Sequence, residues 1–243
     1  QDLRSGDYMG AFREWIIEQR INIREIPDNF SVHMKHLLTF DGVYRTQFWS
    51  MQRNACEVVL SENLELIKTT EQAYVSEIEK LTRQRWQGDP IRVDITYFGK
   101  ISKRNMRNRP YTNIFPTHVV MNTLGDNDIK GGWLELLYHE AAHHLILGSS
   151  YFVSGTINDV AEINKLDIPR QLWHAYLFYL TGKLTQQILT EKGVDYPYTY
   201  MERNGIFSNQ LPVLEEHLGA YMQRKITLAD ATLKILQALA DGK

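Results

Sequence analysis

An apolar run from Trp133 to Leu147 constrains this chain more than any other feature. Apolar residues stand at 133, 134, 136, 137, 141, 142, 145, 146 and 147, followed by Gly148. They cover much of the circumference of a helix, and glycine is a common helix terminator, so the pattern predicts a buried helix. His139, Glu140 and His143 lie inside this run. There, imidazoles and a carboxylate are costly unless hydrogen bonds or a metal ion satisfy them.

The spacing of these polar residues predicts a metal site. His139 and His143 are four residues apart, so on a helix they project from one face and can bind one ion. Glu140 is placed to take a proton from a water on that ion, as in the HExxH pattern of zinc hydrolases. We therefore expect Zn²⁺, with Glu140 as general base. The competing interpretation is a narrow polar stripe that faces solvent. His144 points about 100° away from His143 and is expected to pack rather than bind the ion.

A third ligand has to come from elsewhere in the chain, and three candidates remain open. His174 lies in the apolar and aromatic segment "LWHAYLFYL". Glu162 in "NDVAEIN" and Asp159 in "GTINDV" follow His143 by 19 and 16 residues, in what we expect to be a connection exposed to solvent. We rank His174 first, Glu162 second and Asp159 last, because only His174 lies in a segment that must be buried.

Composition narrows the remaining possibilities. A single cysteine, Cys56, excludes an internal disulfide framework and a cysteine-based zinc site, and we expect it to be a small buried residue. With 43% apolar residues, 23% charged residues and a net charge of −2, the chain has the balance of a soluble globular protein and is not expected to bind nucleic acid. The basic stretch at 99–109 is interpreted as a solvated loop, and His33, His36 and His118 as solvated or packing residues. No apolar run reaches the length of roughly 18 to 20 residues that crosses a bilayer.

The order of elements predicts an α+β fold that is mostly helical, in a single domain over 1–243. Residues 1–88 are expected to form a helical scaffold half. In the second half, 89–243, alternation in "IRVDITYFG" predicts a strand at 91–97, and "THVVMNT" predicts another at 117–123 after a polar loop. Three further helices are expected, one opening at Asp167 and Pro169 and closing at Gly193, the others at 211–225 and 227–240. Residues 149–166 and 195–207 are expected to be irregular.

These segments resemble a known superfamily. "HEAAH" on an apolar helix after the edge-type strand "THVVMNT" resembles the zincin (HExxH) metallopeptidases. "LWHAYLFYLTG", "PYTYMERNGIF" and "LEEHLGAYMQRKITLADATLKIL" are similar to a group of bacterial zincin-like proteins of unassigned role, in which the phrase around His174 carries a recurring histidine. The resemblance implies a small sheet with an edge strand beside the HExxH helix. The spacings after His143 match neither metzincins nor thermolysin-like enzymes.

The resemblance implies a zinc-dependent hydrolase of a peptide or related amide. Tyr198, Tyr200 and Arg203 are candidate donors to the oxyanion, and the peptide is expected along the strand at 117–123. Two alternatives stay open: a zincin-fold module that binds a metal or ligand without hydrolysis, and a helical structural protein with an accidental motif. The chain begins with Gln1, which fits removal of a signal peptide or trimming. We favour export over a cytoplasmic location and make no prediction of oligomeric state.

Overall fold

The structure, a computed structural model, describes residues 39–86, 90–101, 108–114, 117–124, 129–146 and 151–241. The chain divides into two compact units, residues 1–51 and residues 52–243. The described part of the first unit is helical and exposed, and it includes the π-helix η2, Arg45–Trp49. A single domain over 1–243 therefore stays a prediction. His33 and His36 lie outside the described residues.

The second unit is α+β and mostly helical, as predicted. Its helices are α3 (Ser50–Thr82, which begins just before the unit does), α4 (Gly132–Ile146), α5 (Phe152–Asn164), α6 (Leu172–Glu191), α7 (Tyr200–Arg203), α8 (Leu211–Met222) and α9 (Leu228–Asp241). None of the helices in the described residues is both long and apolar enough to cross a membrane.

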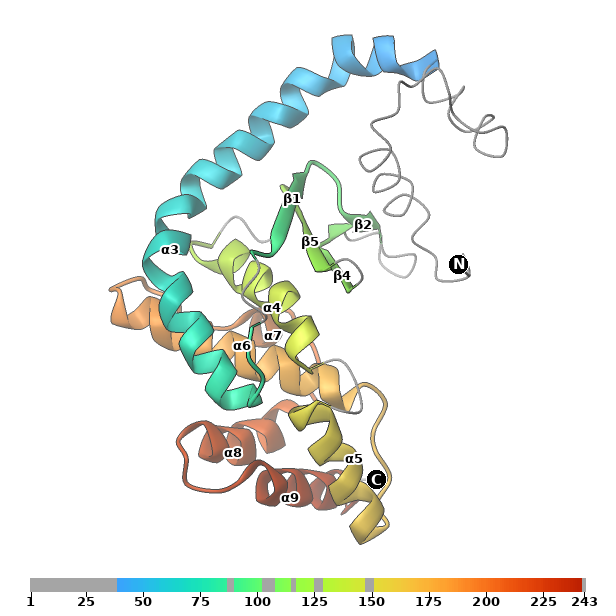
Figure 1. Ribbon diagram of the computed structural model, residues 1–243, viewed down its shortest axis with the longest axis vertical. Coiled ribbons are helices and arrows are strands. Elements are labelled where there is room, and N and C mark those ends of the chain that lie inside the picture. The colour runs from blue at the N-terminus through green and yellow to red at the C-terminus, as the bar shows by residue number, and fades with distance from the viewer. Residues whose placement is uncertain are drawn as a thin grey trace. The chain divides into compact units, whose positions relative to one another are not determined.

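A three-stranded sheet lies against α4 (Figure 1). Its strands are β1 (Arg92–Thr96), β5 (Thr117–Asn122) and β4 (Tyr111–Ile114), in the order β1-β5-β4. β1 runs parallel to β5 with Arg92 opposite His118, and β4 runs antiparallel to β5 with Tyr111 opposite Val120. Two short strands, β2 (Lys100–Ile101) and β3 (Asn108–Arg109), form a separate antiparallel pair.

The position of the edge strand differs from the prediction. The strand predicted at 117–123 exists as β5, but it is the central strand, with neighbours on both sides. The edge strand on the side of the candidate site is β4, which lies inside the segment predicted to be a polar loop. Tyr111, Thr112 and Asn113 lack the run of apolar residues that marks a buried strand, so pairing with β5 rather than local pattern makes this segment a strand.

Helix α4 is the centre of this unit. Every residue of α4 except His143 and His144 is buried, which confirms the predicted buried helix. α4 contacts β4 and β5 on one side and α6 on another. Trp133 at its first turn donates its indole N–H to the Asn122 carbonyl at the end of β5, 3.1 Å away. The sheet and α6 therefore both take their positions from α4.

Helix α3 is joined to α4 through two tyrosines. The rings of Tyr74 and Tyr138 stack with their centroids 4.0 Å apart. The Tyr74 hydroxyl donates to the Tyr138 carbonyl at 3.0 Å, and the Tyr138 hydroxyl lies 2.7 Å from Thr70 Oγ1. Cys56 on the same helix is half-buried rather than buried. A stacked pair of rings and two buried hydrogen bonds thus join α3 to α4.

Two predicted loops contain helices. Residues 149–166, predicted as irregular, hold α5, which buries Val153, Ile157, Val160 and Ala161 and packs on α9. Those four residues recur at helical spacing, so the signal was present in the sequence. Within 195–207, α7 begins at Tyr200, and the N-cap residue Thr199 forms a capping box with Glu202. The predicted helix after Pro169 exists as α6, but it begins only at Leu172 and ends just before Gly193.

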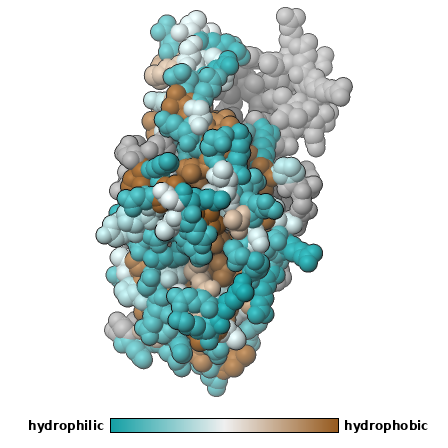
Figure 2. Space-filling model, turned by 90° about the vertical axis from the view of Figure 1, so that its left-hand side faces the viewer, coloured by the Kyte–Doolittle hydropathy of each residue, from teal (hydrophilic) through white to brown (hydrophobic). Residues whose placement is uncertain are grey.

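Helix α3 carries exposed apolar residues and also lines a second cavity. Val58, Leu60 and Leu64 on α3 are exposed, and Figure 2 shows hydrophobic patches between hydrophilic ones on one face of the molecule. α3, β1 and α4 line a mainly apolar cavity of about 710 Å³ that includes Tyr74, Ile91 and Trp133. None of the described residues that line this cavity also lines the candidate site.

Replacing Tyr74 with Phe tests the junction between α3 and α4. We expect Tyr74→Phe to lower the free energy of unfolding by about 1 kcal/mol, because it removes a buried hydrogen bond while keeping the stacked ring. Urea denaturation measures the change. The control is Tyr198→Phe at a side chain that is 62% exposed, where a shift under about 0.5 kcal/mol is expected. Equal effects of the two variants would contradict this account of the junction.

Candidate metal centre

Three histidines from two helices converge on one point. His139 and His143 lie one turn apart on α4, and His174 lies in the first turn of α6. One ring nitrogen of each lies within 4.8 Å of the others, and the Nε2 atoms of His139 and His174 are 3.3 Å apart. Two nitrogens each about 2.05 Å from a tetrahedral ion are separated by roughly 3.3 Å. The three histidines therefore lie close enough to bind one metal ion.

The competing ligands lie elsewhere. Asp159 and Glu162 are exposed on α5 and do not belong to the histidine cluster. Among the described residues, this cluster is the only group of His, Cys, Asp or Glu side chains close enough to hold an ion. Of the three candidates for a third ligand, the structure thus brings His174 to His139 and His143.

A threonine on α6 orients His139. His139 Nδ1 lies 3.4 Å from Thr181 Oγ1, and the Thr181 hydroxyl donates to the Leu177 carbonyl at 2.7 Å. Since the single hydroxyl proton points to Leu177, Thr181 Oγ1 accepts the N–H of Nδ1, which leaves the lone pair on Nε2. That nitrogen faces His174. The His139 ring also stacks on Phe178 with centroids 3.8 Å apart, so its position is held from two sides.

Burial keeps the three imidazoles neutral. It lowers the pKa of His139 well below its usual value, with further lowering from His143 and His174. Burial, with smaller effects of His174 and His144, lowers the pKa of His143 to about 3, and burial lowers that of His174 to about 4. Neutral imidazole is the form that coordinates metals, so all three side chains are in the ligand form at neutral pH.

Glu140 lies next to this cluster and is tied to the edge strand. Its Oε2 is 3.7 Å from His143 Nε2. On β4, Thr112 Oγ1 lies 2.9 Å from the same oxygen and 2.6 Å from the backbone carbonyl oxygen of Glu140. Burial raises the pKa of Glu140 to about 7, although the hydrogen bond from Thr112 lowers it in part. A carboxyl with that pKa exchanges protons readily at neutral pH. Nothing in the sequence around Thr112 indicated that it would contact Glu140.

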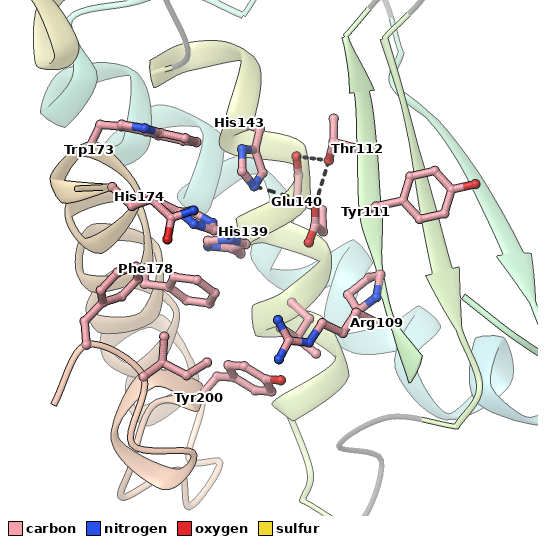
Figure 3. Close-up of a pocket in the computed structure, with 15 residues that line it drawn as sticks. Arg109, Tyr111, Thr112, His139, Glu140, His143, Trp173, His174, Phe178 and Tyr200 are labelled. Carbon is pink, nitrogen blue, oxygen red and sulfur yellow. Dashed lines mark hydrogen bonds and ion pairs between the residues drawn. The ribbon is translucent and has the colours of Figure 1, made fainter. Parts of the chain in front are cut away.

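The histidines and Glu140 open onto a pocket of about 620 Å³. Figure 3 shows the three imidazoles between the α6 side of the pocket and the β4 side. The pocket has a largely aromatic lining on its α6 and α7 side, and its described lining residues are Arg109, Pro110, Tyr111, Thr112, Leu136, His139, Glu140, His143, Gln171, Trp173, His174, Phe178, Tyr200, Ile206 and Phe207. A small organic ligand therefore fits next to the candidate metal site.

The three candidate oxyanion donors fall in different places. Tyr200 lines the pocket, whereas Tyr198 and Arg203 are not among its lining residues. Tyr198 is 62% exposed. Arg203 donates from its guanidinium to the Tyr196 hydroxyl at 2.8 Å, so it supports the chain that carries Tyr200. His118 is buried with its Nε2 3.0 Å from Asn113 Nδ2, and His144 packs edge-on against Trp86, so both are packing residues.

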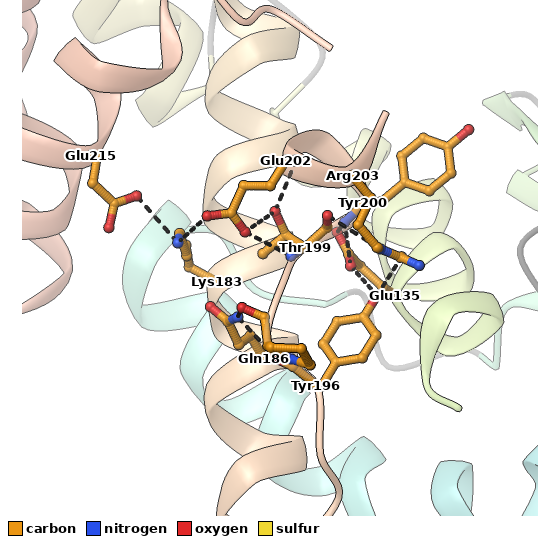
Figure 4. Close-up of polar contacts among 10 residues, drawn as sticks. Glu135, Lys183, Gln186, Tyr196, Thr199, Tyr200, Glu202, Arg203 and Glu215 are labelled. Atoms are coloured by element: carbon orange, nitrogen blue, oxygen red, sulfur yellow. Dashed lines mark hydrogen bonds and ion pairs between the residues drawn. The ribbon is translucent and has the colours of Figure 1, made fainter. Parts of the chain in front are cut away.

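A second buried glutamate on α4 holds the pocket wall. Glu135 accepts hydrogen bonds from the Tyr196 hydroxyl at 2.5 Å and from the Tyr200 backbone N–H at 2.8 Å (Figure 4). A Cβ on Gly182 would lie 2.8 Å from the Glu135 carboxylate, so glycine permits this close approach of α6. On the other side of α7, Lys183 pairs with Glu202 at 3.0 Å and Glu215 at 3.2 Å. Glu135 thus anchors the segment that carries Tyr200 to the helix of His139.

Sequence reasoning overlooked Glu135 although a signal was available. Glu135 is in the same apolar run as His139, one turn earlier. The cost of burying a charged group applied to it as much as to Glu140. Its hydrogen-bond donors are about sixty residues away in the chain, in a segment predicted to be a loop, and only folding could identify them.

No protein-family model, curated protein or solved structure matches this chain. The candidate site has to be interpreted from its own geometry.

The pH dependence of stability tests the environment of Glu135. Burial raises its pKa from 4.5 to about 7, against the hydrogen bonds from Tyr196 and Tyr200. Between these pH values the folded state binds more protons than the unfolded state, so unfolding free energy falls as pH rises across this window. Glu135→Gln removes this titration. The stability of the wild type relative to the variant should therefore fall by about 2 to 3 kcal/mol from pH 4.5 to 7 and stay constant above pH 7.

Both proteins are measured without metal by urea denaturation at each pH. The titrations of the three histidines and Glu140 occur in both, so they cancel in the difference. A difference that is independent of pH would mean that Glu135 titrates as an ordinary glutamate.

Proposed function

We propose that this protein is a zinc-dependent hydrolase that cleaves a peptide or a related amide bond. The observation that carries the proposal is the convergence of three neutral imidazoles beside a buried carboxyl at one pocket. Three histidine ligands with a remaining open position are typical of catalytic zinc, whereas structural zinc sites are closed by four protein ligands. The arrangement of α4, β4 and β5 also supports, for this chain, a zincin-like fold.

His139, His143 and His174 would hold the ion through ring nitrogens, with Thr181 keeping the Nε2 of His139 available. Zinc at this position supplies a Lewis acid that polarises a carbonyl and lowers the pKa of a bound water to about 7. The donor set fits this ion, because imidazole is among its preferred ligands and no cysteine is needed.

Glu140 acts as the proton carrier of the proposed reaction. Its carboxylate would accept a proton from the attacking water and release it afterwards to the leaving amine. Thr112 fixes the direction of its carboxylate by lying 2.9 Å from Oε2. Tyr200 is the one of the three oxyanion candidates that lines the pocket, and its phenol can donate to negative charge that develops on the carbonyl oxygen.

A peptide substrate would lie along β4 instead of the strand expected from the sequence. β4 is at the edge of the sheet, and Tyr111 and Thr112 on it line the pocket. An extended peptide can add to such an edge through main-chain hydrogen bonds. A peptide bound in this way would lie next to Glu140, as the proposed hydrolysis requires.

The ligand set is tested by metal content after zinc is supplied and excess is removed. The wild type should retain about one zinc per chain. We expect His174→Ala to lose at least tenfold in zinc affinity, because it removes one of three ligands. Glu162→Ala, at the exposed position on α5, is the matched control and should retain zinc. Loss in the Glu162 variant with retention in the His174 variant would overturn the assignment.

The chemical role of Glu140 is tested with Glu140→Gln, which keeps the shape of the side chain and removes the base. The variant should bind zinc like the wild type and cleave a mixed peptide library at least about 100-fold more slowly, measured by mass spectrometry. If both proteins bind zinc and neither cleaves, the site is a metal-binding module and not a peptidase. Wild-type cleavage without zinc would also contradict the proposal.

A further inference from the structure

A single arginine stands among the described residues that line the pocket. Of the described residues that line it, Arg109 is the only lysine or arginine, and none of the ion pairs in the described residues involves it. Figure 3 shows its guanidinium directed into the pocket on the side of Tyr200, away from Trp173. From the sequence, the basic stretch at 99–109, which ends at Arg109, is expected to be a solvated loop. A guanidinium at the wall of a pocket, with no ion-pair partner among the described residues, is available to an anionic group of a ligand.

The backbone of Arg109 is held in place on several sides. It pairs with Lys100 across the β2–β3 ladder. Pro110 follows it, and a residue before proline is restricted to extended conformations. Its carbonyl oxygen lies so close to Gly99 that a Cβ at 99 would come within 2.2 Å of it. These constraints fix where the side chain leaves the backbone, although the side chain itself is exposed.

The charges around the pocket favour an anion. Its other described titratable lining groups are the three imidazoles, the phenols of Tyr111 and Tyr200, and the carboxyl of Glu140, which lies against Thr112 on β4. Among the described lining residues, Arg109 therefore supplies the one side chain that is cationic at every physiological pH.

The wall nearest to Arg109 is aromatic. The rings of Phe178 and Tyr200 lie nearly parallel with centroids 6.1 Å apart, and Phe207 lies 6.2 Å from Phe178. Such a wall takes an apolar or aromatic group through burial of its surface. The pocket thus offers an aromatic wall and a guanidinium on the same side.

We propose that the pocket selects substrates that carry a carboxylate next to an apolar or aromatic group, with Arg109 binding the carboxylate. This proposal rests on the proposed function for the statement that the ligand is a peptide or amide. The carboxylate is either the C-terminal carboxylate of a peptide or the side chain of an aspartate or glutamate residue. In both cases Arg109 determines specificity and takes no part in bond cleavage.

Binding measurements test this without requiring catalysis. The probes are N-acetyl-L-phenylalanine and N-acetyl-L-phenylalaninamide, which differ only in the carboxylate. Calorimetry with the full chain, both metal-free and loaded with zinc, gives the affinity ratio of acid to amide. We expect the wild type to bind the acid about tenfold more tightly in both states, the low end for a charge-assisted contact because Arg109 is exposed. Arg109→Gln should bind both probes alike.

The matched control is Arg85→Gln, at an exposed arginine that does not line the pocket, and it should keep the wild-type ratio. A wild type that shows no preference for the acid, or that binds neither probe, overturns the proposal. A preference that survives in Arg109→Gln and disappears on removal of zinc also overturns it, because the metal would then be the carboxylate site. Tighter Arg109-dependent binding of inorganic phosphate than of the acid would do the same.

A blocked peptide, acetyl-Phe-Glu-amide, separates the two sources of the carboxylate. If Arg109→Gln weakens this peptide more than N-acetyl-L-phenylalanine, the pocket takes an acidic side chain, and the reverse result assigns a C-terminal carboxylate. The metal-free measurement keeps this proposal separate from the proposed function. A chain that binds no zinc but prefers the acid through Arg109 retains the carboxylate site and loses the hydrolase.

Discussion

Burial of polar groups on α4 is the constraint on which the rest of the structure depends. Every residue of this helix except His143 and His144 is buried, so Glu135, His139 and Glu140 have little access to water and need partners within the protein. Each finds its partners on a different element: Glu135 on and before α7, His139 on α6 and Glu140 on β4. The pocket lies where these elements meet, because the polar groups of α4 bring them together.

The same burial acts in opposite directions on acids and bases. It lowers the pKa values of the three imidazoles and raises those of the two carboxyls, since desolvation disfavours whichever form is charged. Neutral imidazoles are metal ligands, and a carboxyl with a pKa of about 7 is suited to proton transfer at neutral pH. One physical cause therefore prepares both parts of the proposed site, and Arg109 is the one lysine or arginine among its described lining residues.

Helices and strands with a strong local periodicity were predicted correctly. The segment that becomes a strand only by pairing with another strand was not. The buried helix α4, the strands β1 and β5 and the helix that carries His174 were all predicted. The prediction that residues 149–166 are irregular was wrong, because α5 lies there and its buried apolar residues recur at helical spacing. The predicted edge strand was also wrong, since the polar segment that contains Thr112 becomes the edge only by pairing with β5.

The sequence by itself determined that His139, Glu140 and His143 share a helix too apolar to be exposed, because the period of a helix and the cost of burying charge depend only on neighbouring residues. Only the tertiary structure decided that His174 joins them while Glu162 does not, and that Thr112, Glu135 and Arg109 belong to the same pocket or its wall. The contacts that join these residues to one another and to the wall of the pocket span 28 to 65 positions of the chain. Their proximity depends on how helices and strands pack, which no local pattern encodes.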